Sequence, residues 1–242
     1  MSGVLDFNSR SQLGDRLVAL VDAALDRTQE SSRDYLGASA IGEPCSRRLQ
    51  YQFKGAAQDE GAGFTARTRR IFYRGHQGET WVAKWLRDAG FDLRTEKHGQ
   101  QFGFEDCDGR FKGHIDGVFV GGPDGFKYPA LWENKVLGAK GWASLSKHGL
   151  AKAYPGYAAQ VATYQAYMLL AENPAIFTAL NADTMDIHVE FVAFDQALAQ
   201  GMIDKAASIL AACDHGETMP RVTDDQDGFA CKFCPYKGVC WQ

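Results

Sequence analysis

The chain has 242 residues, with 26 Lys and Arg against 30 Asp and Glu, and its formal net charge is −4. Apolar residues make up 45% of it and charged residues 23%, which excludes a disordered, fibrous or collagen-like protein. The length fits a single domain over residues 1–242, with a core large enough to fold without disulfides. There is no run of about 18 apolar residues that would span a membrane, and the N-terminus lacks the apolar stretch of a secretory signal. We therefore expect a cytoplasmic protein whose six cysteines are thiols or metal ligands.

The first third of the chain is predicted to be helical. Apolar residues recur at intervals of three and four over residues 8–27, which predicts an amphipathic helix. A short helix is expected after Pro44, followed by a Gly- and Ala-rich mobile loop over 55–66. A longer helix is predicted over 67–88, because Gly90 stands just past its C-terminus.

In the middle of the chain the apolar residues alternate with polar ones, which is the pattern of strands. Residues 101–106 predict a weak strand, and residues 109–120 alternate and carry β-forming side chains. Residues 130–137 predict another strand. The segment between them, 121–129, is rich in Gly and Pro, so the two strands are expected to form a hairpin.

The remaining elements alternate between helix and strand. Pro155 suits the first turn of a helix over 156–171. Strands are expected at 176–180 and 186–194, and Asp195 can cap a helix that runs through Ala212. This order predicts a mixed α/β core with helices on the faces of the sheet.

Three charged residues interrupt the apolar pattern of the predicted hairpin. Glu133 and Lys135 are two residues apart on one strand and therefore point to the same face. If Asp116 lies opposite Glu133, two carboxylates converge and repel each other unless a cation lies between them. Mg²⁺ or Mn²⁺ suits such oxygen ligands. The alternative is a cross-strand ion pair on a solvated face.

This hairpin resembles the core of the PD-(D/E)xK nucleases, with Asp116 followed by Glu133-Asn134-Lys135. The resemblance implies a restriction-endonuclease-like fold, a mixed central sheet flanked by helices, with the catalytic core at about 67–194. It also implies that Asp116 and Glu133 hold Mg²⁺ or Mn²⁺ and that Lys135 orients or activates the attacking water. The carbonyl of Asn134 would contact the metal, although this position is usually apolar in the family. Ile115 stands where the family name has proline.

Two further motifs resemble the RecB-like exonuclease branch of that superfamily. Gln160 and Tyr164 share one helix face and match its Q-x-x-x-Y motif, whose residues touch DNA or the active-site water. Core packing is the alternative role for Tyr164. Gly75 and Glu79 match the motif G-x-x-x-(H/E), which implies that Glu79 is a further metal ligand. His76 is the competing candidate for that role.

The C-terminus carries three clustered cysteines in the pattern C-x2-C-x5-C, namely Cys231, Cys234 and Cys240. Three thiols need a fourth ligand to complete a tetrahedral or cubane site, and Cys45 is the best candidate. A zinc site with the same four thiolates competes with an iron–sulfur cluster, because spacing alone does not separate the two.

The segment around Cys45 resembles the first cysteine region of the iron–sulfur nucleases, which include AddB-like and CRISPR-associated RecB-like exonucleases. The resemblance implies a 4Fe-4S cluster that joins residues 39–54 to residues 228–242 as a clasp. The matching motif is S-x(n)-C-x-R-x(n)-Y, carried by Ser39, Cys45, Arg47 and Tyr51. Cys107 and Cys213 are then expected to be buried free thiols.

The resemblance implies a metal-dependent DNA exonuclease that hydrolyses phosphodiester bonds and prefers single-stranded ends. Its setting would be recombination, repair, phage DNA processing or CRISPR adaptation. The alternatives are a structure-specific or restriction-type endonuclease on the same core, and an inactive metal-clasped DNA-binding module. Partners other than DNA would be a second copy of the chain or recombination and CRISPR proteins. A local basic groove is compatible with the acidic total charge, and its candidate residues are Arg47, Arg70, Arg74, Lys140 and Trp142.

Overall fold

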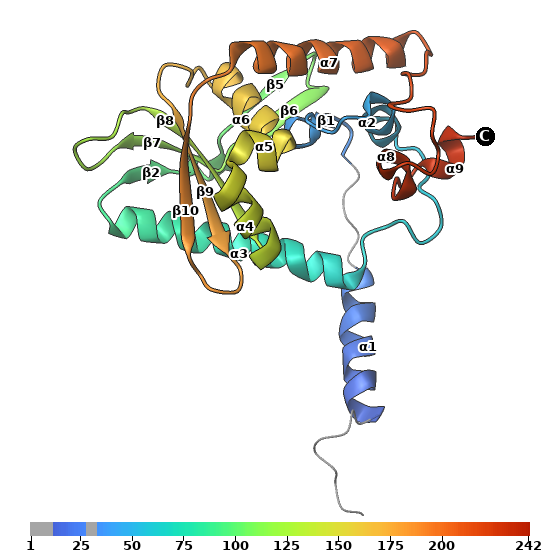
Figure 1. The fold of residues 1–242 in the computed structure, drawn as a ribbon, viewed down its shortest axis with the longest axis horizontal. Coiled ribbons are helices and arrows are strands. Elements are labelled where there is room, and N and C mark those ends of the chain that lie inside the picture. The colour runs from blue at the N-terminus through green and yellow to red at the C-terminus, as the bar shows by residue number, and fades with distance from the viewer. Residues whose placement is uncertain (1–11, 28–32) are drawn as a thin grey trace, which may run out of the picture.

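A computed structural model describes residues 12–27 and 33–242 of the chain (Figure 1). The predicted N-terminal helix is observed as α1 (Gln12–Asp26), and residues 8–11 of that prediction lie outside the described residues. The predicted long helix is α3 (Ala66–Asp88), which begins where the Thr65 side chain accepts a hydrogen bond from the backbone N–H of Thr68 at 3.2 Å.

A mixed sheet of five strands forms the centre of the fold. Its order is β10-β9-β8-β7-β2, and β8 pairs antiparallel with β7 and parallel with β9. The predicted hairpin is therefore confirmed as β7 and β8, with Gly117 opposite Trp132. The five strands are β2 (Asp92–Arg94), β7 (Gly117–Gly121), β8 (Ala130–Leu137), β9 (Ala175–Asn181) and β10 (Ile187–Val192).

The prediction of one continuous strand over 109–120 is wrong. The chain leaves a three-stranded sheet after His114 and enters the central sheet at Gly117, so Ile115 and Asp116 lie between two strands. Gly117 allows this entry, because a Cβ atom there would lie 2.8 Å from the backbone oxygen of Arg94 on the neighbouring strand. The smaller sheets contain β1 (Leu36–Gly37), β6 (Phe111–His114) and β5 (Gly103–Asp106), and separately β3 (Glu96–Lys97) and β4 (Gln100–Gln101).

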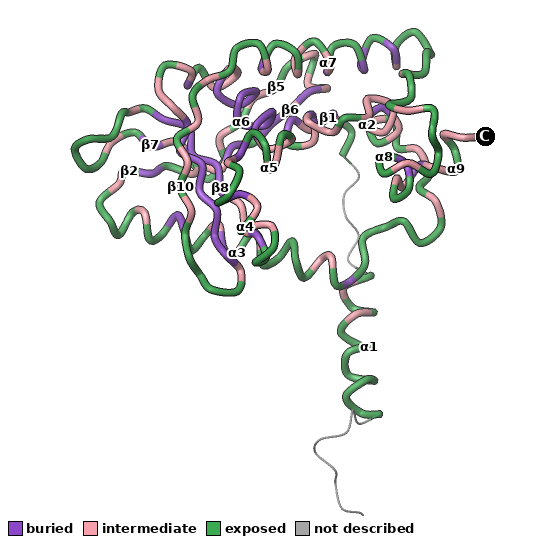
Figure 2. The backbone as a smooth tube through the Cα atoms, viewed as in Figure 1, coloured by how far each residue is buried: buried purple, intermediate pink, exposed green. Residues whose placement is uncertain are grey.

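Helices cover both faces of the central sheet, as the mixed α/β prediction requires. On one face, Val82 of α3 and Trp132 of β8 belong to one apolar core. On the other face, Leu131 of β8 shares a second core with Val161 of α6 (Pro155–Tyr167). The next layer is α7 (Gln196–Asp214), which packs on α6. Figure 2 shows the buried backbone concentrated in the sheet and α6.

The segment between β8 and β9 contains more helix than predicted. It holds α4 (Ala139–His148) and α5 (Leu150–Ala153), joined at Gly149, whose φ of 73° suits glycine. The predicted helix over 156–171 ends early at Tyr167, because Leu169 adopts a left-handed φ of 56°. The predicted cap of α7 is confirmed, since Asp195 Oδ1 accepts from the Leu198 N–H at 2.9 Å.

Three short helices from distant parts of the chain lie together around one pocket. They are α2 (Ser46–Phe53), α8 (Phe229–Lys232) and α9 (Lys237–Cys240). The short helix η1 (Ala38–Ala40) instead contacts α6 and β6. The loop predicted to be mobile is tied to the C-terminal segment: the Asp59 N–H donates to the Pro235 oxygen at 2.8 Å, and the Asp59 carboxylate accepts from the Gly238 N–H. None of the helices in the described part of the chain has the length and apolarity to cross a membrane.

Candidate active site

The central strand β8 carries three polar residues in a row between buried apolar ones. Leu131 and Leu137 belong to the core beneath α6, and Trp132 belongs to the core beneath α3. By strand alternation, Glu133 and Lys135 point to the α6 face. Both are therefore ionisable side chains in a position where the sheet is otherwise apolar.

The Glu133 carboxylate is buried and only half satisfied by hydrogen bonds. Its Oε1 accepts from the Gln160 side-chain amide at 2.7 Å and from the Lys135 ammonium. Its Oε2 is buried without a hydrogen-bond partner among the described residues. Burial, followed by the nearby Asp116 charge, raises the pKa of Glu133 from 4.5 to about 8. The unpartnered oxygen is available to a further ligand, and the raised pKa shows that burial disfavours the charged carboxylate.

Asp116 reaches this position through the break between β6 and β7. Its Oδ2 accepts from the backbone N–H of Asn134 at 2.7 Å, which fixes the carboxylate beside β8. Burial raises the pKa of Asp116, while the Lys135 charge and the Asn134 hydrogen bond lower it. The predicted meeting of Asp116 with the β8 motif is therefore present in the structure.

Glu79 approaches the same group from α3. The helix lies close to the sheet at Gly78, where a Cβ atom would be 2.4 Å from Val136 Cγ2 on β8. Burial, followed by the Asp116 charge, raises the pKa of Glu79 from 4.5 to about 7. His76 is exposed, and its charge lowers the pKa of Asp116, so it lies within electrostatic reach as well. The choice between Glu79 and His76 as a metal ligand stays a prediction.

Lys135 is held as a charged group. Burial opposes its charge, but the carboxylates of Glu133 and Asp116 outweigh that effect and raise its pKa. Its Nζ also lies 5.1 Å from the ring centroid of Tyr157, in the range of a cation–π contact. Sequence reasoning missed Tyr157, although its place three residues before Gln160 puts both on one face of α6.

The Tyr164 side chain is buried beside the same group of residues. Burial, followed by the Glu133 charge, raises its pKa. A Cβ atom at Gly113 would lie 2.7 Å from the Tyr164 ring, so the side chain is packed against β6. Both of its proposed roles, in packing and at the site, fit this position.

On the opposite face of β8, the Asn134 side-chain oxygen accepts a hydrogen bond from the Thr178 hydroxyl at 2.8 Å.

The donor set suits Mg²⁺ or Mn²⁺, but it is not a preformed cage. Within residues 12–27 and 33–242, no group of three or more His, Cys, Asp or Glu side chains is arranged to hold a metal ion as it stands. The carboxylates of Asp116, Glu79 and Glu133 nevertheless interact electrostatically, because the Asp116 charge raises the pKa of both Glu79 and Glu133. Mutual repulsion of this kind is relieved by a bound cation.

The four cysteines predicted as cluster ligands line one pocket. The pocket is bounded by Cys45, Cys231, Cys234 and Cys240, together with the side chains of Arg47 and Arg48 among others. All four cysteines are free thiols. Burial raises the pKa of Cys234, while a backbone hydrogen bond at Tyr236 and the Arg48 charge lower it.

Cys107 and Cys213 lie outside that pocket as free thiols, but both are partly exposed rather than buried as predicted. Cys213 accepts a hydrogen bond from the Gln50 amide at 3.7 Å, and Cys107 is half-buried beside Asp106.

The candidate DNA-contacting residues are dispersed over the structure. Arg47 lies in the thiol pocket, where its Nε donates to the Met219 oxygen. Arg70 pairs with Asp22, Arg74 is exposed on α3, and Lys140 is exposed on α4. Trp142 is partly buried with its ring 6.4 Å from that of His188. Their contacts with DNA stay predictions.

Three solved structures resemble the fold. An alkaline exonuclease, LHK-Exo, from Laribacter hongkongensis aligns with a TM-score of 0.53 and 16% identity, over 82% of this chain and 93% of that chain. The fold is shared with an exonuclease. LHK-Exo in complex with dAMP aligns with a TM-score of 0.51 and 17% identity, over 75% of this chain and 89% of that chain. SSO0001 aligns with a TM-score of 0.50 and 12% identity, over 96% of this chain and 98% of that chain. No family model and no curated protein matches the chain. At these identities the likeness establishes the fold, and activity must be argued from the residues.

Proposed function

We propose that the chain is a Mg²⁺- or Mn²⁺-dependent DNA exonuclease of the PD-(D/E)xK type. The observation that carries the proposal is the buried Glu133 carboxylate, which has one unpartnered oxygen and lies beside Asp116 and the Lys135 ammonium. Burying such a carboxylate costs free energy that an apolar side chain would not incur. Its presence on the central strand is therefore best explained by chemistry.

The carboxylates and Lys135 have different roles in the proposed reaction. Asp116, Glu133 and Glu79 would hold the metal with the carbonyl of Asn134, and the bound ion would lower the pKa of a water and polarise the scissile phosphate. Gln160 fixes Glu133 Oε1 and leaves Oε2 free. Lys135, kept charged by the carboxylates, orients the attacking water or neutralises charge that develops on the phosphate.

The proposed substrate is DNA with free ends, preferably single-stranded. Support comes from the shared fold, since one of the similar structures is of an exonuclease bound to dAMP. Recombination, repair, phage DNA processing or CRISPR adaptation would supply such ends.

We also propose that the thiol pocket binds a 4Fe-4S cluster, as in the RecB-like branch. Support comes from the four cysteines, which line one pocket although the first precedes the nuclease motifs and three follow them. Anaerobically purified protein should be brown and contain about four irons per chain. A colourless protein with one zinc per chain would replace the cluster with the zinc alternative.

The nuclease proposal is tested with DNA labelled at one end or the other, in single- and double-stranded form, with Mn²⁺ or EDTA. We expect Mn²⁺-dependent release of nucleotides from ends and no cutting of circular single strands. Glu133→Ala and Lys135→Ala should abolish it. Glu105→Ala, which removes an exposed carboxylate that pairs with Lys112, is the matched control and should keep full activity. Unchanged degradation by the Glu133 and Lys135 variants would refute the catalytic assignment, and cutting of circles would favour an endonuclease.

A further inference from the structure

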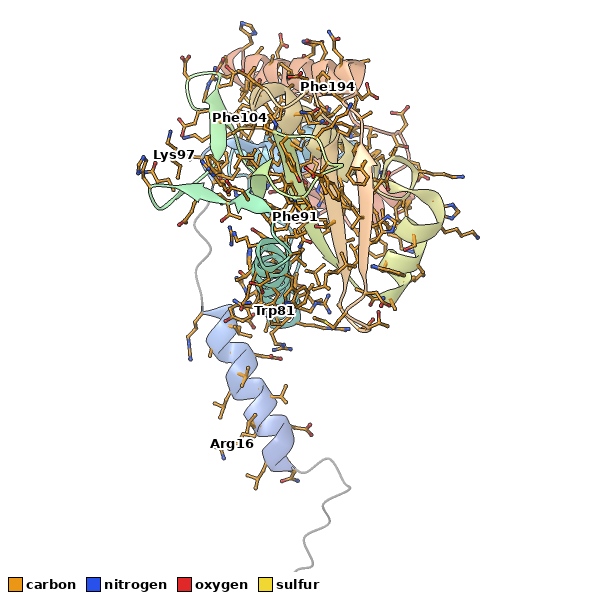
Figure 3. The ribbon with its side chains drawn as sticks, turned by 90° about the vertical axis from the view of Figure 1, so that its left-hand side faces the viewer. Arg16, Trp81, Phe91, Lys97, Phe104 and Phe194 are labelled. Atoms are coloured by element: carbon orange, nitrogen blue, oxygen red, sulfur yellow. The ribbon has the colours of Figure 1, made fainter. Side chains whose placement is uncertain are left out.

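A row of three polar side chains lies inside the apolar core between the central sheet and α3. Trp132 and Asn134 are on β8, and Thr178 lies opposite Asn134 on β9, between Ile176 and Leu180 of that core. The exposed fractions of Trp132, Asn134 and Thr178 are 0%, 5% and 1%. Figure 3 looks along α3 and shows the helix against the strands. Polar groups in such a place cost free energy unless they are hydrogen-bonded.

The hydrogen bonds in this row run in one direction. The indole N–H of Trp132 can only donate, and it donates to the Thr178 hydroxyl oxygen at 2.9 Å. The Thr178 hydroxyl in turn donates to the Asn134 side-chain oxygen at 2.8 Å. The Asn134 side-chain nitrogen is buried without a hydrogen-bond partner among the described residues. The Thr178 hydroxyl is therefore what holds the Asn134 side chain in this core.

The backbone of Asn134 connects this row to the candidate active site. The pairing of β7 with β8 ends at Gly117 and Trp132. Two residues further along β8, the Asn134 N–H donates to Asp116 Oδ2 at 2.7 Å, so that a side chain takes the place of a strand partner. The Asn134 carbonyl is also a proposed metal ligand. A shift of β8 at Asn134 would therefore move both Asp116 and that carbonyl.

We propose that Thr178 is a positioning residue of the metal site, because it holds Asn134 and, through the Asn134 backbone, Asp116. This role rests on the proposed nuclease site and adds a residue of β9 to it. Without the hydroxyl, both polar atoms of the buried Asn134 amide would lack a partner. The cost of burying them in that state favours a rotation of the side chain and a shift of β8.

Binding of Mn²⁺ to the full chain without DNA tests the proposal, with electron paramagnetic resonance to measure the free ion. Thr178→Val keeps the shape of the side chain but removes the hydroxyl. It should weaken Mn²⁺ binding about 10- to 100-fold, as loss of a group that supports metal ligands does elsewhere. Thr178→Ser keeps the hydroxyl and should bind Mn²⁺ like the wild type.

Thr163→Val is the matched control. Thr163 is also fully buried, but its hydroxyl donates to the Ala159 oxygen of its own helix, α6, at 2.8 Å. The variant therefore loses a buried hydroxyl that does not hold Asn134, and it should bind Mn²⁺ like the wild type. Urea denaturation of each variant in EDTA shows whether the proteins compared are folded.

Two outcomes would overturn the positioning role. One is a Thr178→Val protein that binds Mn²⁺ as tightly as the wild type. The other is an equal loss of binding in Thr163→Val, which would make the effect one of general stability. If Thr178→Val does not fold, Thr178→Ala removes the same hydroxyl without a methyl against the indole, and the same weakening is expected. A wild-type chain that binds no Mn²⁺ would instead refute the proposed nuclease site, and this role with it.

Discussion

Replacing Glu133 by Gln should make the metal-free protein more stable at alkaline pH. The pKa of Glu133 is raised from 4.5 to about 8 in the folded protein, chiefly by burial. For a raised pKa, the stabilising contribution is complete below the unfolded value and is lost as pH rises through the folded value. The loss therefore falls between pH 4.5 and about 8. Gln keeps the side-chain oxygen that accepts from Gln160 and cannot ionise.

The size of the effect follows from the two pKa values. The difference between 4.5 and about 8, at ~1.4 kcal/mol for each unit, gives about 5 kcal/mol as an upper estimate for the fully buried Glu133. Glu79, with a pKa raised to about 7, is present in both proteins, and its charge is one of the lesser causes that raise the pKa of Glu133. We expect the stability advantage of Glu133→Gln to grow by a few kcal/mol between pH 5 and pH 9.

Urea denaturation at several pH values in EDTA measures this difference. The curves of stability against pH should diverge above pH 5, and Mn²⁺ should restore the stability of the wild type while changing the variant little. Parallel curves would show that ionising Glu133 costs no stability, which would refute the raised pKa of this carboxyl. Activity should be lost in the variant at every pH.

Two other predictions concern the elements that support the site. Gly78→Ala should destabilise the protein by ~1–3 kcal/mol in denaturant unfolding, since the new Cβ would lie 2.4 Å from Val136 Cγ2. Gly75→Ala on the same helix, where a Cβ meets nothing within 4 Å, should instead stabilise it by up to ~1 kcal/mol, and equal effects would contradict the helix–strand contact. Tyr157→Leu should lower kcat about tenfold by removing the ring beside Lys135, whereas Tyr157→Phe should keep most of it, as single-turnover assays would show.

Local patterns predicted those parts of the fold that depend on neighbouring residues. The strand β8, its hairpin with β7 and the Asp195 cap of α7 each depend on a few successive residues. The predicted face shared by Glu133 and Lys135 also follows from strand alternation alone. These features were confirmed because nothing distant changes them.

Features that depend on distant partners could not be predicted in the same way. The break at Asp116 arises because β6 pairs with β1 and β5 while β7 pairs with β2 and β8. The bond from Thr178 to Asn134 spans 44 residues and ties β9 to the motif. Neither partner carries a local signal of the contact.

The thiol pocket and the carboxylates are joined through one helix. The segment between Cys45 and α3 is fastened at Asp59, which bonds the C-terminal segment at Pro235 and Gly238. Because α3 begins just after this loop and carries Glu79 to the site, we expect disruption of the pocket to displace the start of α3. Glu133, by contrast, is held within the sheet and by α6. Loss of the thiols should therefore affect the Glu79 side of the site before the Glu133 side.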